Sequence, residues 1–135
     1  PTNRHKNYLK KCVKQEEEHR KGLELLVLDG MPMELIKESI EISKLKQKIY
    51  TYMHNNNFTK AEKNVDKLKQ LFIEMSNDLT FNPERYYTGV VDLENNGSNN
   101  DRTWVDVTHD GSRKLLDEMK GNLEWFERNI AFLKS

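Results

Sequence analysis

The chain contains few of the residues that cross-link, break or bend a polypeptide. Among its 135 residues are one cysteine, three prolines and six glycines. A single cysteine excludes an intramolecular disulfide and is typical of proteins from a reducing compartment. No apolar run reaches the roughly 18 residues that a membrane-spanning helix needs, and no apolar stretch follows the charged N-terminus as it would in a signal peptide. We therefore expect a cytoplasmic protein without a membrane partner.

The chain also lacks net charge. Lysine plus arginine and aspartate plus glutamate both number 22, so the formal charge is zero. This balance argues against a nucleic-acid partner, since such proteins usually present an excess of positive charge. The N-terminal run RHKNYLKK is locally basic, but QEEE follows soon after it, and the simplest interpretation is a helix with solvated basic side chains. A charged share of 33% beside 36% hydrophobic residues fits a helical protein with long solvated faces.

Apolar residues recur at three- and four-residue steps over most of the chain, which predicts four amphipathic helices. The first covers about residues 3–28 and ends at an Asp-Gly pair, a common C-terminal signal. The second begins at Pro32, which suits a first helical turn, and ends at the run HNNN, because asparagine favours turns. Thr59 and Glu62 have capping-box spacing at the start of the third.

The turns between the first three helices are short, and short turns force neighbouring helices to be antiparallel. The predicted fold is therefore mainly α: a four-helix bundle with antiparallel neighbours, forming a single helical domain over residues 1–135. The positions expected to face the core are Leu9, Cys12, Glu16, His19, Leu23 and Leu26 in the first helix; Leu35, Glu38, Ile42, Leu45, Ile49 and Tyr52 in the second; Ala61, Val65, Leu68, Phe72, Met75 and Leu79 in the third; and Leu116, Met119, Leu123, Phe126, Ile130 and Leu133 in the fourth.

The pattern changes between the third and fourth helices. The runs RYYTGVVDL and RTWVDVT are rich in Tyr, Val, Thr and Trp, and the loop ENNGSNND lies between them. Two β-prone runs around such a loop predict a β-hairpin. We place it at about residues 85–108, inserted before the last helix, which we expect to open at Asp110 or Ser112. An isolated hairpin is only marginally stable in water, so this one has to pack on the helices, pair with another strand or await a partner.

The hairpin and its flanks concentrate residues suited to binding. Exposed aromatic side chains beside an arginine are typical of protein-binding hot spots, and the same side chains can stack on a base or hold a phosphate. The simplest alternative is that these aromatic residues cover the bundle core. The candidate partner- or ligand-binding residues are Phe81, Arg85, Tyr86, Tyr87, Trp104, Asp106 and His109.

Glu16 and His19 interrupt the apolar seam of the first helix. Glu-x-x-His on an inward helix face is a ligand motif of carboxylate-bridged di-iron sites, which need the motif twice and a Glu from each of two other helices. The motif occurs once, the fourth seam has no acid, and antiparallel pairing places His19 opposite Ile42 rather than Glu38. We therefore expect no metal and no cofactor. A 3.6-residue period drifts against a heptad, so the pair marks where the helix turns from the core or where a second chain packs.

No catalytic arrangement stands out. Asp106 and His109 would point to opposite faces of a strand, and Cys12 on a helix seam is more typical of a small core residue than of a nucleophile. There is no Gly-rich phosphate loop, no zinc spacing and no serine in a nucleophile motif. The asparagine-rich loops are typical of AT-rich genomes, as in low-GC bacteria and their phages.

The sequence therefore predicts a protein that is not an enzyme. We expect an interaction protein, such as an adaptor, inhibitor or scaffold, that binds a protein partner or itself through the hairpin and the adjacent helix faces. Small helical bundles commonly self-associate, so a homo-oligomer is expected. The alternative is a small-molecule protein that binds or sequesters a nucleotide-like ligand through the Arg and aromatic residues of the hairpin region.

Overall fold

The computed structural model describes the backbone of residues 2–26, 33–81 and 104–135, and the side chains of residues 2–25, 36–78 and 113–135. The described chain forms four helices in sequence order. They are α1 (Asn3–Leu26), α2 (Met33–His54), α3 (Phe58–Phe81) and α4 (Trp104–Lys134).

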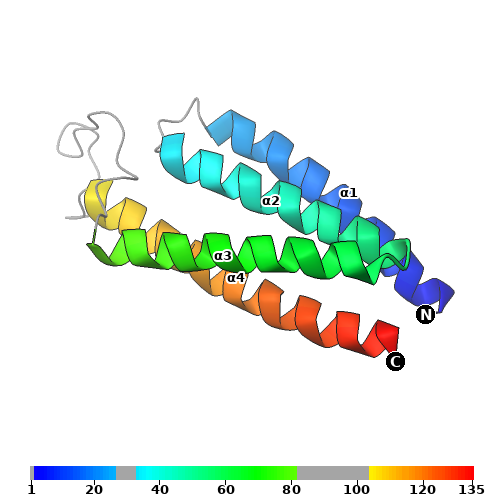
Figure 1. Cartoon of the computed structure of the whole chain (residues 1–135). Coiled ribbons are helices and arrows are strands. Elements are labelled where there is room, and N and C mark those ends of the chain that lie inside the picture. Colours follow the sequence, from blue (N-terminus) through cyan, green and yellow to red (C-terminus); the bar gives the residue numbers. More distant parts are fainter. Residues whose placement is uncertain (1, 27–32, 82–103) are drawn as a thin grey trace.

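The helices run alternately up and down the long axis of the molecule, so that both chain ends and the α2–α3 turn lie at one end (Figure 1). The α2 helix packs closely on both α1 and α3, and α3 packs on α4. At the end that holds the termini, α1 and α4 meet through aromatic side chains. The His5 and Phe132 rings stack at 5.7 Å, and the Tyr8 and Trp125 rings lie 5.9 Å apart. The predicted bundle of antiparallel neighbours is confirmed for these helices.

One hydrophobic core runs through the bundle and receives side chains from all four helices. Phe126 of α4 is fully buried, and its ring contacts that of Tyr50 from α2 edge-on at 5.0 Å. Each large apolar side chain that becomes fully buried stabilises the fold by about 1.5–3 kcal/mol. The fully or nearly fully buried residues of this core include Leu9, Ile49, Met53, Leu68, Met75, Met119 and Phe126.

Most seam positions predicted from the sequence are buried where the structure describes their side chains, including Glu16 and Glu38. Leu45, Tyr52, Phe72 and Leu116 are only half-buried, and His19 lies exposed on α1. Tyr50 and Met53 of α2 are buried although the heptad count did not select them. The reason is that an α-helix has 3.6 residues per turn, so its buried face drifts relative to a seven-residue repeat. By the end of α2 the buried stripe has rotated to include these two residues.

The predicted β-hairpin is wrong. Residues 104–108, which were expected to form its second strand, are the first turn and a half of α4, and no residue of the described backbone is in a strand. The expected first strand lies outside the described residues. The expected helix start at Asp110 or Ser112 is also wrong, since both lie inside α4. The preference of valine, threonine and tryptophan for strands is weak, and tertiary context overrides it.

The turn between α2 and α3 is built from three asparagines. Asn56 has a positive φ of 59°, the amide of Asn57 donates to the carbonyl of Tyr52 at 2.8 Å, and the amide of Asn56 donates to the carbonyl of Met53 at 3.1 Å. These two bonds define a Schellman motif, in which a left-handed residue ends a helix. Asn57 then caps α3, since its Oδ1 accepts from the amide of Lys60 at 3.3 Å. The predicted capping box further along is therefore wrong.

We expect the left-handed residue of this turn to be sensitive to a side chain that branches at Cβ. Asn56→Val should lower the free energy of unfolding by about 1–2 kcal/mol, because β-branched residues are strained at positive φ. Asn56→Gly should change it by less than about 1 kcal/mol in either direction. Urea denaturation of both variants checks this, and equal stability of the valine and glycine variants would contradict it.

Candidate interaction surfaces

The structure does not describe the side chains of the seven residues predicted for the hairpin site. Two of the helices contain some of them, but the side chains of all seven lie outside the described residues. Because the backbone of α4 is helical at residues 106 and 109, the expectation that strand alternation separates Asp106 from His109 loses its basis. The nucleotide-like ligand rests on the same residues and stays a prediction. The seven residues are Phe81, Arg85, Tyr86, Tyr87, Trp104, Asp106 and His109.

Glu16 is held in the core by partners on α2. Its Oε1 accepts a hydrogen bond from the Ser43 hydroxyl at 3.1 Å, and its Oε2 lies 3.2 Å from Nζ of Lys46. The Ser43 hydroxyl, which is only 1% exposed, also accepts from a guanidinium nitrogen of Arg20 at 3.3 Å. A buried carboxylate is tolerated only when paired and hydrogen-bonded. These contacts explain the glutamate that interrupts the apolar seam.

His19 does not share this network. It lines, with Glu16 and with Glu118 and Asn122 of α4, a small pocket of about 30 Å³ between α1, α2 and α4. That volume is enough for one or two water molecules. Among the described residues, no three histidine, cysteine, aspartate or glutamate side chains are grouped as metal ligands. The carboxylate of Glu16 therefore has an evident structural role at the α1–α2 interface.

Cys12 is buried between two tyrosines. Burial raises the pKa of its thiol above the ordinary value of 9.0; Glu16 also raises it, whereas a hydrogen bond with Tyr8 and the charges of two lysines act the other way. Burial likewise raises the pKa of Tyr50, with a further contribution from Cys12. Both groups are therefore neutral at physiological pH. A protonated thiol is a poor nucleophile, so Cys12 acts as a packing residue.

A stripe of exposed residues runs along α1 and borders α4 at its Tyr8 end, where the Tyr8 ring lies against that of Trp125. Its members recur at alternating steps of four and three, so they share one face of the helix. Tyr8, 50% exposed, and Leu25, 65% exposed, stand near its two ends, and they are two of the four large hydrophobic residues that lie exposed among the described side chains. We call this stripe the α1 outer face: Arg4, Tyr8, Lys11, Gln15, Glu18, Gly22 and Leu25.

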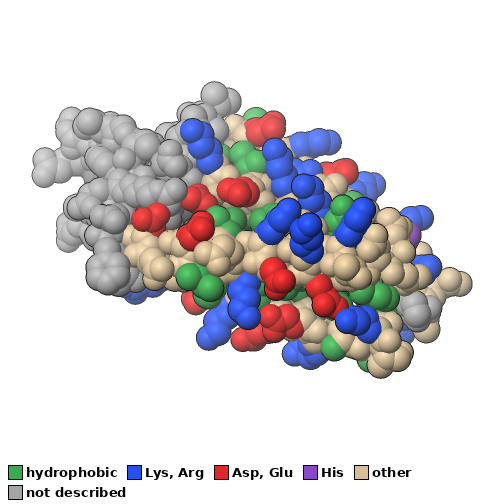
Figure 2. Space-filling view, in the orientation of Figure 1, with side chains coloured by type: hydrophobic (Ala, Val, Ile, Leu, Met, Phe, Trp, Pro, Cys, Tyr) green, Lys and Arg blue, Asp and Glu red, His purple; other side chains and the backbone are tan. Residues whose placement is uncertain are grey.

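Charge is unevenly distributed along the bundle although the total is zero. In the half that contains the termini, four helix halves carry fifteen lysines and arginines and four acids, a net charge of +11. In the other half, the described side chains include ten acids and five bases, a net charge of −5. Figure 2 shows many of the basic side chains gathered over α2 and α3 toward the end that holds the termini. The basic half comprises residues 3–14, 44–54, 58–69 and 120–134.

Comparison with known proteins identifies no relative: no protein-family model, no curated protein and no solved structure matches the chain. None of the helices in the described part of the chain is long and apolar enough to cross a membrane. Function therefore has to be inferred from the surfaces themselves.

We expect the buried carboxylate of Glu16 to contribute more to the free energy of unfolding than the exposed carboxylate of Glu17. Glu16→Gln should lower the free energy of unfolding by about 1.5–3 kcal/mol, because charge-assisted hydrogen bonds are lost and Lys46 loses its partner. Glu17 is the matched control, since its carboxylate accepts from Gln47 at 2.8 Å at an exposed site. Glu17→Gln should cost less than about 1 kcal/mol. Equal losses for the two variants in urea denaturation would contradict the structural role of Glu16.

The raised pKa of Tyr50 predicts a loss of stability in alkali. An acid whose folded pKa lies above its unfolded pKa contributes stability that is fully present below the unfolded value, 10.0 for tyrosine, and is lost as the pH rises through the folded value. The melting temperature should therefore fall as the pH rises above about 10. Tyr50→Phe, which removes the titrating group, should show a shallower fall. Parallel curves for wild type and Tyr50→Phe in thermal melts followed by circular dichroism would contradict this.

Proposed function

We propose that this protein is a non-enzymatic interaction protein that associates with a second copy of itself through the α1 outer face. The observation that supports the proposal is the symmetry of that face. From Tyr8 to Leu25 the face is centred between residues 16 and 17: Tyr8 and Leu25 lie at equal distances from that point, and so do Lys11 and Gly22. A face with this property can meet its own copy across a two-fold axis, as most homodimers do.

The axis pairs the two α1 helices side by side and antiparallel. Tyr8 of one copy then meets Leu25 of the second, and this contact occurs twice. Lys11 lies across Gly22, where an added Cβ would have no neighbour within 4 Å, so a second helix can approach closely. Spacing by alternating fours and threes is also the spacing of residues that interlock between paired helices.

The antiparallel arrangement also brings unlike charges together. The first half of α1, up to Lys14, contains five basic residues and no acid, whereas its second half contains four acids and two bases. Pairing the halves in opposite directions sets the basic part of one helix against the acidic part of the other. A parallel pair would instead oppose like charges, so electrostatics favour the antiparallel arrangement.

The contact is small and mostly polar. Only two half-exposed apolar side chains per copy become buried, at about 25 cal/mol for each Å² removed from water. Part of that gain is offset by the lost freedom of the two molecules. We therefore expect a reversible dimer with a dissociation constant in the micromolar range or weaker, rather than a permanent assembly.

Sedimentation velocity over a concentration series tests this proposal. Wild type should shift from monomer to dimer as concentration rises, and Tyr8→Ala with Leu25→Ala should weaken dimerisation at least about tenfold, since burial of two apolar side chains per copy is lost. Ile73 of α3, 45% exposed, gives the matched control, because Ile73→Ala removes exposed apolar surface elsewhere. Equal weakening by the control, or a wild type that stays monomeric, would contradict the proposal.

A charge exchange tests the orientation. Lys11 and Glu18 are seven residues apart on α1, about 10 Å along the helix axis, so they do not pair within one molecule. In the antiparallel dimer, Glu18 of the second copy lies one turn from the Gly22 that Lys11 meets. Lys11→Glu alone and Glu18→Lys alone should each weaken the dimer, and the double variant should recover most of the loss. Failure of the double variant to recover would exclude the antiparallel register.

A further inference from the structure

We propose that the exposed face shared by α2 and α3 in the basic half of the bundle binds single-stranded nucleic acid. This activity is separate from the self-association proposed above, because it uses other helices. The six residues that form this α2–α3 basic face are Lys44, Lys48, Tyr52, Lys60, Lys63 and Lys67.

The lysines of this face are brought together by the antiparallel turn. The turn at residues 55–57 places the last half of α2 beside the first half of α3. The exposed lysines are four residues apart on α2 and recur at three- and four-residue steps on α3. Lys60 confirms the pairing, since its Nζ lies 5.7 Å from the centroid of the Tyr52 ring. Five positive charges thus share one surface. A bound polyanion would reduce the repulsion between them.

These charges are available to a ligand. Three other lysines of the basic half are paired: Lys46 with Glu16, Lys69 with Glu127 and Lys134 with Glu62. Within the described residues, none of the five lysines of the α2–α3 basic face lies within 4.0 Å of a carboxylate oxygen. Glu62 and Asp66 line a different groove, between α3 and α4. The basic face therefore keeps its full positive charge in the folded protein.

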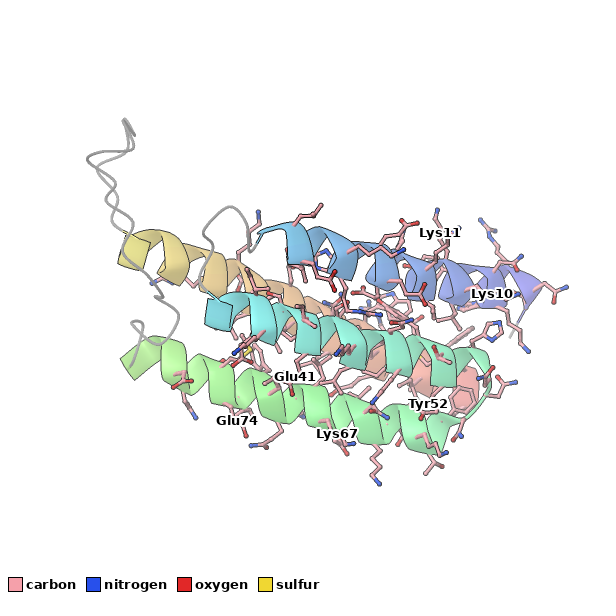
Figure 3. All side chains as sticks on the ribbon, turned by 90° about the horizontal axis from the view of Figure 1, so that it is seen from above. Lys10, Lys11, Glu41, Tyr52, Lys67 and Glu74 are labelled. Atoms are coloured by element: carbon pink, nitrogen blue, oxygen red, sulfur yellow. The ribbon has the colours of Figure 1, made fainter. Side chains whose placement is uncertain are left out.

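The face has a defined limit along the bundle. Figure 3 shows Tyr52 and Lys67 toward the α2–α3 turn, and Glu41 and Glu74 farther along the same two helices. Lys44 to Tyr52 spans eight residues of α2, about 12 Å. A short stretch of a phosphate backbone fits this length, whereas a long ligand lying along the helices would meet the acidic half.

The chemistry of the face favours nucleic acid over other anionic partners. Tyr52 lies among the lysines and lines a shallow depression of about 300 Å³ with Lys44 and Lys48. An aromatic ring beside basic side chains can stack a base while the lysines contact phosphates, and unpaired strands offer such bases. A membrane surface needs exposed apolar side chains to insert, and among the described residues neither α2 nor the part of α3 that belongs to the basic half exposes a large hydrophobic side chain.

Fluorescence anisotropy with a labelled oligothymidylate tests the proposal. Five phosphate contacts should give a slope of about −3.5 for log K against log salt concentration, and Lys44→Gln with Lys48→Gln should reduce it to about −2. Lys21→Gln with Lys37→Gln makes the same change of charge in the acidic half and is the matched control. Absence of binding at low salt, or an equal loss with the control pair, would overturn the proposal.

Tyr52 separates nucleic acid from other polyanions. Tyr52→Leu should weaken oligonucleotide binding at least about fivefold, and Tyr52→Phe should preserve it, because stacking needs the ring and not the hydroxyl. Polyglutamate and phosphatidylserine vesicles should bind more weakly than the oligonucleotide. Equal binding of either probe, or full affinity of Tyr52→Leu, would overturn the assignment. The substitutions at Lys44, Lys48 and Tyr52 lie on α2 and leave the α1 outer face unchanged, so sedimentation of these variants should match wild type.

Discussion

The burial of one carboxylate fixes how α1 lies on α2, and much of the surface follows from that. Glu16 sits in a seam otherwise made of leucine and cysteine, and its two oxygens require a hydroxyl and an ammonium group that only α2 supplies. Sliding α1 by one turn would leave a charged group without partners in the core, which costs several kcal/mol. The register that satisfies Glu16 also decides which side of α1 is left in water, and that side carries both Tyr8 and Leu25.

The alternation of helix direction converts a neutral sequence into a polarised molecule. Basic residues are concentrated early in α1, late in α2 and early in α3, and the first of these segments is about 30 residues from the other two in the chain. Folding brings them to one end because neighbouring helices are antiparallel (Figure 1). Gathering like charges costs free energy, and in α1 and α2 of this half only Lys46 has a buried acid to offset it. Repulsion among these basic side chains lowers the stability of the fold, and a ligand or partner of negative charge is the simplest explanation for it.

The sequence allowed the four helices and most of the core to be predicted, because a regular apolar period reflects burial directly. Two failures have physical causes. The run that contains Trp104 was assigned to a strand from its β-branched and aromatic residues, but such preferences amount to fractions of a kcal/mol and context overrides them. The α2–α3 basic face was not predicted, because only the net charge of the whole chain and one N-terminal run were considered. Dividing each helix at its midpoint would have shown it, since Lys44 and Lys67 become neighbours only after the turn is formed. Tyr8 and Leu25 were likewise hidden among polar residues outside the seams.

The two proposed surfaces affect one another through geometry. In an antiparallel dimer the basic half of one copy lies beside the acidic half of the other, so the two α2–α3 basic faces point toward opposite ends of the assembly. The α1 helix has 24 residues, about 36 Å of length, and the two faces are separated by a distance of that order. An unpaired strand that spans this distance without lying along the acidic halves would contact both faces, and the second contact would benefit from a high effective concentration. A weak dimer and a weak nucleic-acid face would then reinforce each other, because each copy bound on a strand raises the local concentration of the next. Self-association and binding are therefore expected to be linked in free energy even though they share no residue.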